Sequence, residues 1–427
     1  MIPTYSPREF QDKFIFAKTK KQPFDEGVFE TVKQILEDIR TRGDQALREY
    51  TEKFDGYGGT NWEVTAEERK AAWKGVSPEV IESLEKAAAN IRSFHSKQLQ
   101  QSRIMEMSED IISGQLFRPI ERTGIYVPGG KASYPSTVLM NAIPASLAGV
   151  KEIIMTTPVR DGENIPSILS VAADIAGVHK IYKIGGSQAI AALAYGTELI
   201  PSVDKIVGPG NAYVAAAKSL VFGDVGIDMI AGPSEVAIIA DETANPVFIA
   251  ADLIAQAEHD EKARSFLFST SKKLVDEVME EVKKQCRELP RKDIAEVSLR
   301  NEGAAVVADS VDQAFELANA LAPEHLEIQL ENALQHVSKV KNAGSVFIGS
   351  YTPEAVGDYF AGPNHVLPTV GTARFSSGLS VDDFVKKTTY VYYSEHALRQ
   401  AAPYIETLAA KEELDGHARA VKVRLKS

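Results

Sequence analysis

The chain has 427 residues, of which 44% are hydrophobic and 25% are charged. This balance is ordinary for a globular protein, and the length is enough for roughly two to four domains. Lysine and arginine total 47 while aspartate and glutamate total 59, which gives a formal net charge of -12 at pH 7. Such a charge repels polyanions and anionic membrane surfaces, so we expect no nucleic-acid partner and no membrane partner.

The single cysteine, Cys286, excludes a disulfide within the chain and lies in the charged helical pattern EEVKKQCREL. The first residues, MIPTYSPREFQDKF, lack the basic segment and apolar run of a signal peptide. No uninterrupted apolar stretch approaches the about 18 residues of a membrane span. We therefore expect a cytoplasmic protein in which Cys286 is a bystander on a helix.

The first part of the chain has the pattern of amphipathic helices. Between Gly27 and Phe54, and between Ser77 and Gln100, apolar residues recur at helical spacing among charged residues. Ser77 followed by Pro78 is a favourable helix start, because serine caps the helix and proline suits its first turn. Nothing in these helices suggests a functional site.

Near Arg122 the pattern changes to short apolar runs that alternate with helical segments. The runs predict strands, in chain order TGIYVPGG, KEIIMTTPV, HKIYKIGG, VDKIVGPG and EVAIIAD. Strand, helix and strand at this interval indicate right-handed crossovers and a parallel sheet covered on both faces. We therefore predict a doubly wound α/β domain over roughly Tyr126 to Pro233.

A second alternation follows, in which the predicted strands are SFLFST, GAAVVADS, HLEIQL and GSVFIG. After Ser380 the chain has a mostly helical pattern and ends in the basic run ARAVKVRLKS. The predicted fold class is α/β. It comprises two Rossmann-like, doubly wound parallel-sheet domains with a small N-terminal segment and a helical C-terminal segment.

Glycine-rich turns follow three predicted strands, in VPGGKASYPS, IGGSQAIA and VGPGNAYVA. In a doubly wound sheet the ligand lies at the carboxyl ends of the strands, where such turns let the backbone approach it. The last turn begins like the dinucleotide fingerprint G-x-G-x-x-G with Gly208 and Gly210, but Tyr213 replaces the third glycine. Spacing alone therefore leaves open a dinucleotide site and three purely structural turns.

Polar clusters provide candidate catalytic and metal-binding residues. Gln256 and His259, in IAQAEHDEKA, are three positions apart and share one face if the helix from Val247 continues to them. Such a pair can hold one metal ion, although polar helix ends often show this pattern without any function. Three further clusters are Glu324 with His325 in LAPEHLEI, Asp358 with His365 in VGDYFAGPNHVLP, and Glu412 with His417 in EELDGHARAV. The other histidines, interpreted as surface or packing residues, are His95, His179, His336 and His396.

Eight motifs, in this order and at these separations, resemble the histidinol dehydrogenase family. They are GIYVPGG, GGSQAIAALAYGT, DKIVGPGN, AGPSE, AQAEH, APEHLEI, GDYFAGPNHVLPT and ELDGHARAV. The resemblance extends from about Phe24 to the C-terminal region. Two departures are Ile230, where many relatives carry proline, and Ala255, where serine is common. Neither residue is an implied ligand.

The resemblance implies a zinc- and NAD-dependent enzyme of histidine biosynthesis that oxidises L-histidinol to L-histidine through L-histidinal, with two NAD. It implies His325 as the acid/base and Glu324 as the residue that activates water for the aldehyde step. The implied ligands of one zinc per subunit are Gln256, His259, Asp358 and His417. The implied NAD contacts are Tyr126, Gln188 and Asn211. The implied substrate contacts are Ser234, Gln256, His259, His325, Asp358, Glu412 and His417.

The resemblance also implies an intertwined homodimer with shared active sites, in which His417 reaches into the partner's site. The implied domains are an N-terminal arm (1–23), a first α/β domain with most catalytic and metal residues (24–125 plus 234–379), an inserted NAD-binding domain (126–233) and a helical tail that contributes to the partner's site (380–427).

The implied ligand types suit a catalytic rather than a structural zinc site. Two imidazoles, one carboxylate and one amide oxygen bind zinc less tightly than a thiolate cage and leave positions open. The neutral Gln256 leaves positive charge on the metal, which would attract the nitrogen atoms of histidinol and so position the substrate. His325, with an unperturbed pKa of about 6.5, is suited to accept protons near neutral pH.

Three alternatives remain open at this level. A dehydrogenase of the same scaffold could act on another small polyol or a sulfonated alcohol, because a fold does not determine a substrate. Ser234 and Glu412, which could bind an amine, favour histidinol. A zinc hydrolase that uses Glu324 would need no NAD, and a metal-binding or assembly protein would show no turnover at all.

Overall fold

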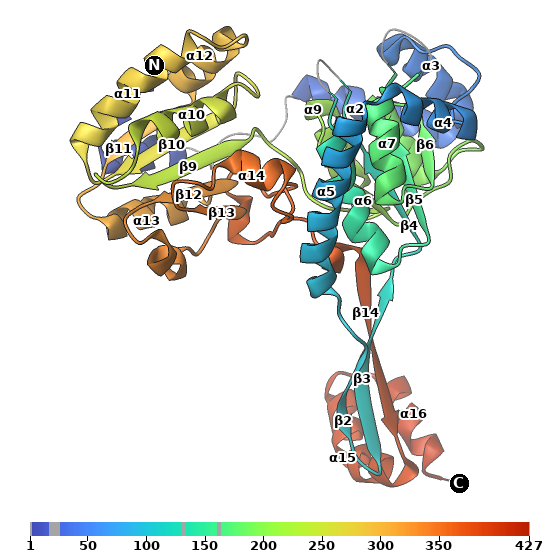
Figure 1. The fold of residues 1–427 in the computed structure, drawn as a ribbon. Helices are drawn as coiled ribbons and strands as arrows, with labels where there is room; N and C mark the ends of the chain where they lie inside the picture. Colours follow the sequence, from blue (N-terminus) through green and yellow to red (C-terminus); the bar gives the residue numbers. More distant parts are fainter. Residues whose placement is uncertain (1, 17–25, 130–132, 160–163, 427) are drawn as a thin grey trace.

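The computed structural model describes residues 2–16, 26–129, 133–159 and 164–426. The expected domain boundary between residues 23 and 24, and residues 130–132 of the first glycine-rich turn, lie outside the described residues. Figure 1 shows two α/β lobes side by side, with a long extension below them. We name them the five-stranded lobe, the six-stranded lobe and the extension.

The five-stranded lobe contains a parallel sheet with strand order β6-β5-β4-β7-β8. Its strands are β4 (Arg122–Tyr126), β5 (Glu152–Thr156), β6 (Lys180–Tyr182), β7 (Lys205–Val207) and β8 (Gly226–Ile227). The crossover helices are α6 (Pro135–Ala148), α7 (Ser167–Ala176), α8 (Gly186–Tyr195) and α9 (Ala212–Val221). The first four predicted strands and the helices between them are confirmed, because their continuous apolar runs are buried on both faces of the sheet. The fifth predicted strand, EVAIIAD, belongs instead to the other sheet, and the two-residue β8, which was not predicted, is the edge strand here.

The N-terminal helices pack on this same lobe. They are α2 (Glu26–Arg42), α3 (Asp44–Asp55), α4 (Ala66–Gly75) and α5 (Pro78–His95), followed by the short 3-10 helix η3 (Ser96–Gln98). Gly43, with a positive φ of 55°, separates α2 from α3. Ser77 caps α5 as predicted. These helices share hydrophobic clusters with α6–α9, so the expected grouping of residues 24–125 with residues 234–379 differs from the observed packing.

The six-stranded lobe contains a second parallel sheet, with strand order β1-β11-β10-β9-β12-β13. Its strands are β1 (Thr4–Tyr5), β9 (Glu235–Ala240), β10 (Arg264–Ser269), β11 (Ala304–Val307), β12 (His325–Gln329) and β13 (Ser345–Ile348). Its helices are α10 (Pro246–Ala257), α11 (Lys272–Cys286), α12 (Lys292–Asn301), α13 (Val311–Leu321), α14 (Glu354–Tyr359) and the 3-10 helix η4 (Ala333–Lys339). Apart from the edge strand β1, the two sheets have the same strand order. When the strands of each sheet are counted along the chain, this order is 3-2-1-4-5.

The N-terminal residues complete the six-stranded lobe. After β1, the helix α1 (Pro7–Phe10) and the π-helix η1 (Gln11–Ile15) lie over the sheet. The ring of Phe10 is fully buried, with its centroid 5.2 Å from that of Phe14, 5.6 Å from that of Phe266 and 5.1 Å from that of Phe268. This aromatic cluster fastens the start of the chain to β10.

The extension is an antiparallel sheet of order β14-β3-β2 with two helices at its tip (Figure 1). Its elements are β2 (Arg103–Met107), β3 (Ile111–Pro119), β14 (Val385–Tyr393), α15 (Glu395–Lys411) and α16 (Asp415–Arg424). Two short 3-10 helices, η5 (Thr372–Arg374) and η6 (Val381–Phe384), precede β14. The C-terminal tail is therefore less helical than expected, because β14 pairs along β3 from Val385↔Pro119 to Tyr393↔Ile111.

Of the helices in the described part of the chain, none combines the length and the apolar content that crossing a bilayer requires.

Phe10→Ala should lower the free energy of unfolding by about 3–5 kcal/mol, because it removes a large, fully buried ring and leaves a cavity. Phe375→Ala is the matched control, since that side chain is 81% exposed. The control should change stability by less than about 0.5 kcal/mol. Urea unfolding followed by circular dichroism measures both. Similar losses for the two variants would contradict the role of the aromatic cluster.

Candidate active site

Glu324 and His325 lie at the amino end of β12, next to the amino end of β9. The peptide N–H of Glu235 donates a hydrogen bond to Glu324 Oε2 at 2.9 Å. The carbonyl oxygen of the same residue lies 3.1 Å from His325 Nδ1. The backbone N–H and carbonyl groups of one residue of β9 therefore contact both side chains of the predicted catalytic pair.

The hydrogen bond to Glu235 determines the tautomer of His325. A carbonyl oxygen can only accept, so Nδ1 carries the proton and Nε2 presents its lone pair. His325 Nε2 is buried and has no hydrogen-bond partner among the described residues. Burial lowers the pKa of His325 to about 4, although the nearby Asp358 carboxylate acts in the opposite direction. The ring is therefore neutral near pH 7, which is the state that a general base needs.

The Glu324 carboxyl is also buried, at 6% exposed. Burial raises its pKa well above the usual range, while hydrogen bonds from the Glu235 N–H and the Ser234 side chain favour the charged form. Glu324 Oε2 lies 3.9 Å from His325 Nδ1. The structure thus brings the predicted residues Ser234, Glu324 and His325 into one site.

Helix α14 and the end of α10 bring the metal-type donors to this site. Gln256 is fully buried in the last turn of α10, and His259 follows two residues after that helix. With its amide nitrogen facing Glu354, the Gln256 side chain donates to both carboxylate oxygens, at 3.2 and 3.1 Å. This orientation leaves the amide oxygen free to act as a ligand. Asp358 Oδ1 lies 4.0 Å from His325 Nε2.

One group of potential ligand atoms is especially compact. Atoms of His325, Glu354 and Asp358 all lie within 4.8 Å of one another. His259 lies close enough for its charge to act on both His325 and His365. Such a set of imidazole, carboxylate and amide donors fits a zinc-type ion, and the unpartnered Nε2 of His325 faces the same space.

A cavity of about 210 Å³ lies beside these groups. It is lined by His325, Asp358 and His365 together with apolar side chains that include Val346, Phe347 and Leu367. His365 Nδ1 lies 3.0 Å from the Asp358 carbonyl oxygen, and burial lowers the pKa of His365. The cavity can therefore hold a small ligand with both polar and apolar parts.

The loop after α14 connects the site to the five-stranded lobe. Asn364 Nδ2 donates to the carbonyl oxygen of Met140 in α6 at 2.6 Å. Asn90 Nδ2, in α5, donates to the carbonyl oxygen of Phe360 at 2.8 Å. The residues that line the cavity are thus held against the other lobe.

Glu354 is a site residue that the sequence analysis missed. It is 5% exposed, its Oε1 lies 3.5 Å from His325 Nδ1, and burial raises its pKa well above the usual range. Its own peptide N–H donates to Glu327 Oε1 at 3.2 Å. A signal was present, because Glu354 and Asp358 are four residues apart and share one face of a short helix.

His417 and Glu412 are not brought to this site within one chain. Glu412 caps the end of α15 and His417 lies in α16, and both are exposed. Figure 1 shows these helices at the tip of the extension, far from α14 and β12.

The predicted NAD contacts lie at the carboxyl edge of the five-stranded sheet. The hydroxyl oxygen of Tyr126 accepts a hydrogen bond from the Gly186 N–H at 3.1 Å, and burial raises the pKa of Tyr126 to about 12. Gln188 Nε2 donates to Asp55 Oδ2 at 3.2 Å. Asn211 caps α9 by accepting from two backbone N–H groups. This edge is where doubly wound sheets bind their ligands.

Comparisons with known proteins identify the family of the chain. A family model described as histidinol dehydrogenase matches residues 18–425. The chain is 56% identical over 400 residues to the histidinol dehydrogenase of Clostridium acetobutylicum, covering 93% of each chain. It is 53% identical over 393 residues to that of Listeria monocytogenes serotype 4b, covering 92% of each. The crystal structure of histidinol dehydrogenase from Elizabethkingia anophelis is 42% identical, with a TM-score of 0.94, and the match covers 100% of this chain and 98% of that one. The chain therefore belongs to the histidinol dehydrogenase family.

Proposed function

We propose that the chain oxidises L-histidinol to L-histidine through L-histidinal, with the reduction of two NAD, as the last steps of histidine biosynthesis. Membership of the family supports the reaction. The observation that carries the proposal is the meeting of Glu324 and His325 with metal-type donors, beside a cavity that His325 and Asp358 line.

His325 is proposed as the acid/base of both oxidation steps. In the first step its Nε2 takes the hydroxyl proton of the alcohol while the hydride passes to NAD, which leaves the aldehyde. In the second step it takes a proton from the aldehyde hydrate in the same way. The neutral ring and the unpartnered Nε2 support this role.

Glu324 is proposed as the base that takes a proton from water as the water adds to the aldehyde, while His325 returns the proton from the first step to the aldehyde oxygen. This addition forms the hydrate and makes His325 neutral again for the second step. Only the charged form of Glu324 can accept a proton, and the hydrogen bonds from the Glu235 N–H and the Ser234 side chain favour that form. Its position beside His325 allows both half-reactions to occur at one site.

The proposed zinc site, one per subunit, consists of Gln256, His259 and Asp358 from one chain and His417 from a second copy. Glu354 holds the Gln256 amide so that its oxygen is free for this purpose. When bound, zinc supplies a positive charge that attracts the imidazole and amine nitrogens of the substrate. Ser234, His325 and Glu412 complete the proposed substrate contacts, and the proposed NAD contacts are Tyr126, Gln188 and Asn211.

The proposed active assembly is a homodimer with shared sites. The exposed positions of Glu412 and His417 support this assembly, because α15 and α16 lie at the tip of the extension (Figure 1). The extension also exposes large apolar side chains, which typify an interface. They include Met105, Met107, Val391, Tyr404 and Leu408. Two extensions that exchange places would bury these side chains and complete each site.

The purified protein should produce two NADH per L-histidinol consumed, and a chelator should abolish this production because the substrate would lose its anchor. Absorbance at the NADH band measures it. Added zinc should restore the activity. One NADH per substrate, or turnover of non-imidazole alcohols at an equal rate, would contradict the proposal.

Glu324→Gln should slow the aldehyde-to-acid half by about 10²–10⁴-fold and the alcohol-to-aldehyde half far less, because only the former needs activated water. Single-turnover assays started from histidinol or from histidinal measure each half. His325→Asn is the comparison variant and should slow both halves. Equal losses for both halves in Glu324→Gln would refute the division of labour.

Mixing inactive His417→Ala chains with inactive His259→Ala chains should restore activity, because each mixed dimer contains one site with both histidines. With equal amounts and full exchange, about a quarter of the wild-type activity should return. Mixing two batches of His417→Ala is the control and should restore nothing. Verified subunit exchange without recovery would count against a shared site.

A further inference from the structure

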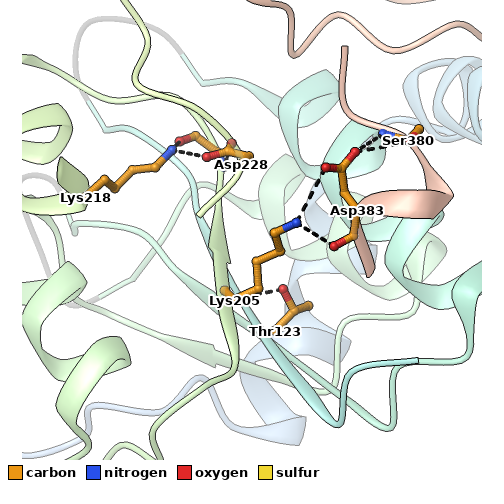
Figure 2. Close-up of polar contacts among 7 residues, drawn as sticks. Thr123, Lys205, Lys218, Asp228, Ser380 and Asp383 are labelled. Atoms are coloured by element: carbon orange, nitrogen blue, oxygen red, sulfur yellow. Dashed lines mark hydrogen bonds and ion pairs between the residues drawn. The ribbon is translucent and has the colours of Figure 1, made fainter. Parts of the chain in front are cut away.

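Two lysines lie near opposite ends of β7, and each makes an ion pair (Figure 2). The pair of Lys218 and Asp228 is deeply buried, with side chains 3% and 1% exposed. Burying two charges is costly, and such a pair is weak evidence of added stability. The contacts of the pair indicate another role.

Both charged groups also bind the backbone of one residue, Gly208. Lys218 Nζ donates to the carbonyl oxygen of Gly208 at 2.9 Å. The Gly208 N–H donates to Asp228 Oδ2 at 2.8 Å. The two polar backbone atoms of this glycine are thus held by opposite members of one ion pair, which fixes the orientation of the peptide units on either side.

Gly208 begins the turn Gly208–Asn211 at the carboxyl end of β7. It adopts a φ of 112°, and a Cβ there would lie 2.2 Å from the carbonyl oxygen of Tyr126. The turn therefore packs directly on the backbone of Tyr126 and ends at the cap of α9. Tyr126 and Asn211 are two of the three proposed NAD contacts.

We propose that Lys218 and Asp228 are positioning residues for NAD, which hold the Gly208–Asn211 turn in the conformation that receives the cofactor. This inference rests on the proposed function, since it takes NAD to bind at this edge. A loop that is already ordered spends less free energy on binding than a loop that must become ordered. The ion pair provides hydrogen-bond partners for the backbone N–H and carbonyl oxygen of Gly208, which would otherwise need water as a partner.

Lys205 provides a matched control on the same strand. It begins β7, and its Nζ donates to the carbonyl oxygen of Asp383 at 2.6 Å and lies 3.5 Å from Asp383 Oδ1. Asp383 in turn accepts from the Ser380 N–H at 2.8 Å (Figure 2). This pair joins β7 to η6, and none of its described contacts involves the turn.

The test compares the double variant Lys218→Met/Asp228→Leu with Lys205→Met in the full-length, zinc-loaded protein. Methionine and leucine keep the outlines of the replaced side chains and leave no unpaired buried charge. The double variant should raise the KM for NAD by about tenfold, through the lost ordering of the turn. Its kcat at saturating NAD, its KM for histidinol and its zinc content should stay at the wild-type values. Lys205→Met should change none of these.

An unchanged KM for NAD in the folded double variant would overturn the inference. A lower kcat together with a higher KM for histidinol would also overturn it, because these changes would indicate general damage to the protein. If the double variant does not fold, Lys218→Met/Asp228→Asn takes its place, because asparagine keeps an acceptor for the Gly208 N–H. A KM for NAD above wild type then supports the inference and a wild-type KM overturns it. A wild-type chain that makes no NADH from histidinol overturns the proposed function itself, and the inference with it.

Discussion

Glu235 lies at the start of β9, and its peptide N–H and carbonyl groups both interact with the first side chains of the neighbouring strand β12. Its own carboxylate is held as well, since Arg264 pairs with Oε1 at 3.1 Å and the Val370 N–H donates to Oε2 at 3.0 Å. Val370 adopts a φ of 53°, a strained conformation for a β-branched residue, which is maintained only because its surroundings hold it. The orientation of the proposed catalytic pair therefore depends on the register of β9 against β12. A slip of one residue in this register would turn each of the two side chains to the other face of the sheet.

The two sheets place their polar groups at opposite edges. The five-stranded sheet carries Tyr126, Gln188 and Asn211 at its carboxyl edge, where the rule for doubly wound sheets expects a ligand. The six-stranded sheet has the same strand order apart from β1, yet Glu324 and His325 lie at its amino edge, where β9 and β12 begin. The loop after α14 joins these regions through hydrogen bonds to α5 and α6. Under the proposed function, histidinol at the six-stranded lobe would thus donate its hydride to NAD at the five-stranded lobe.

Burial is the main cause of the protonation states in this site. The imidazole of His325 is kept neutral because a charged ring would be desolvated, and the carboxyls of Glu324 and Glu354 are biased toward protonation for the same reason. A dication placed among these groups would reverse the bias on the carboxyls, because opposite charge favours the ionised form. Metal binding would therefore be coupled to the protonation state of the site.

The sequence alone determined the elements and the local pairs. Apolar periodicity predicted the crossover helices and the strands of both sheets apart from the two-residue strands β1 and β8. Glu324 with His325 stood out because they are adjacent in the chain. Spacing along the chain carries no comparable information about which elements meet. Only the tertiary structure placed Glu354 against Gln256, packed α2–α5 on the five-stranded lobe and paired β14 with β3. The physical reason is that periodicity encodes which face of an element is buried, whereas its partner depends on the shapes and hydrogen-bonding edges that remain free once the sheets have formed.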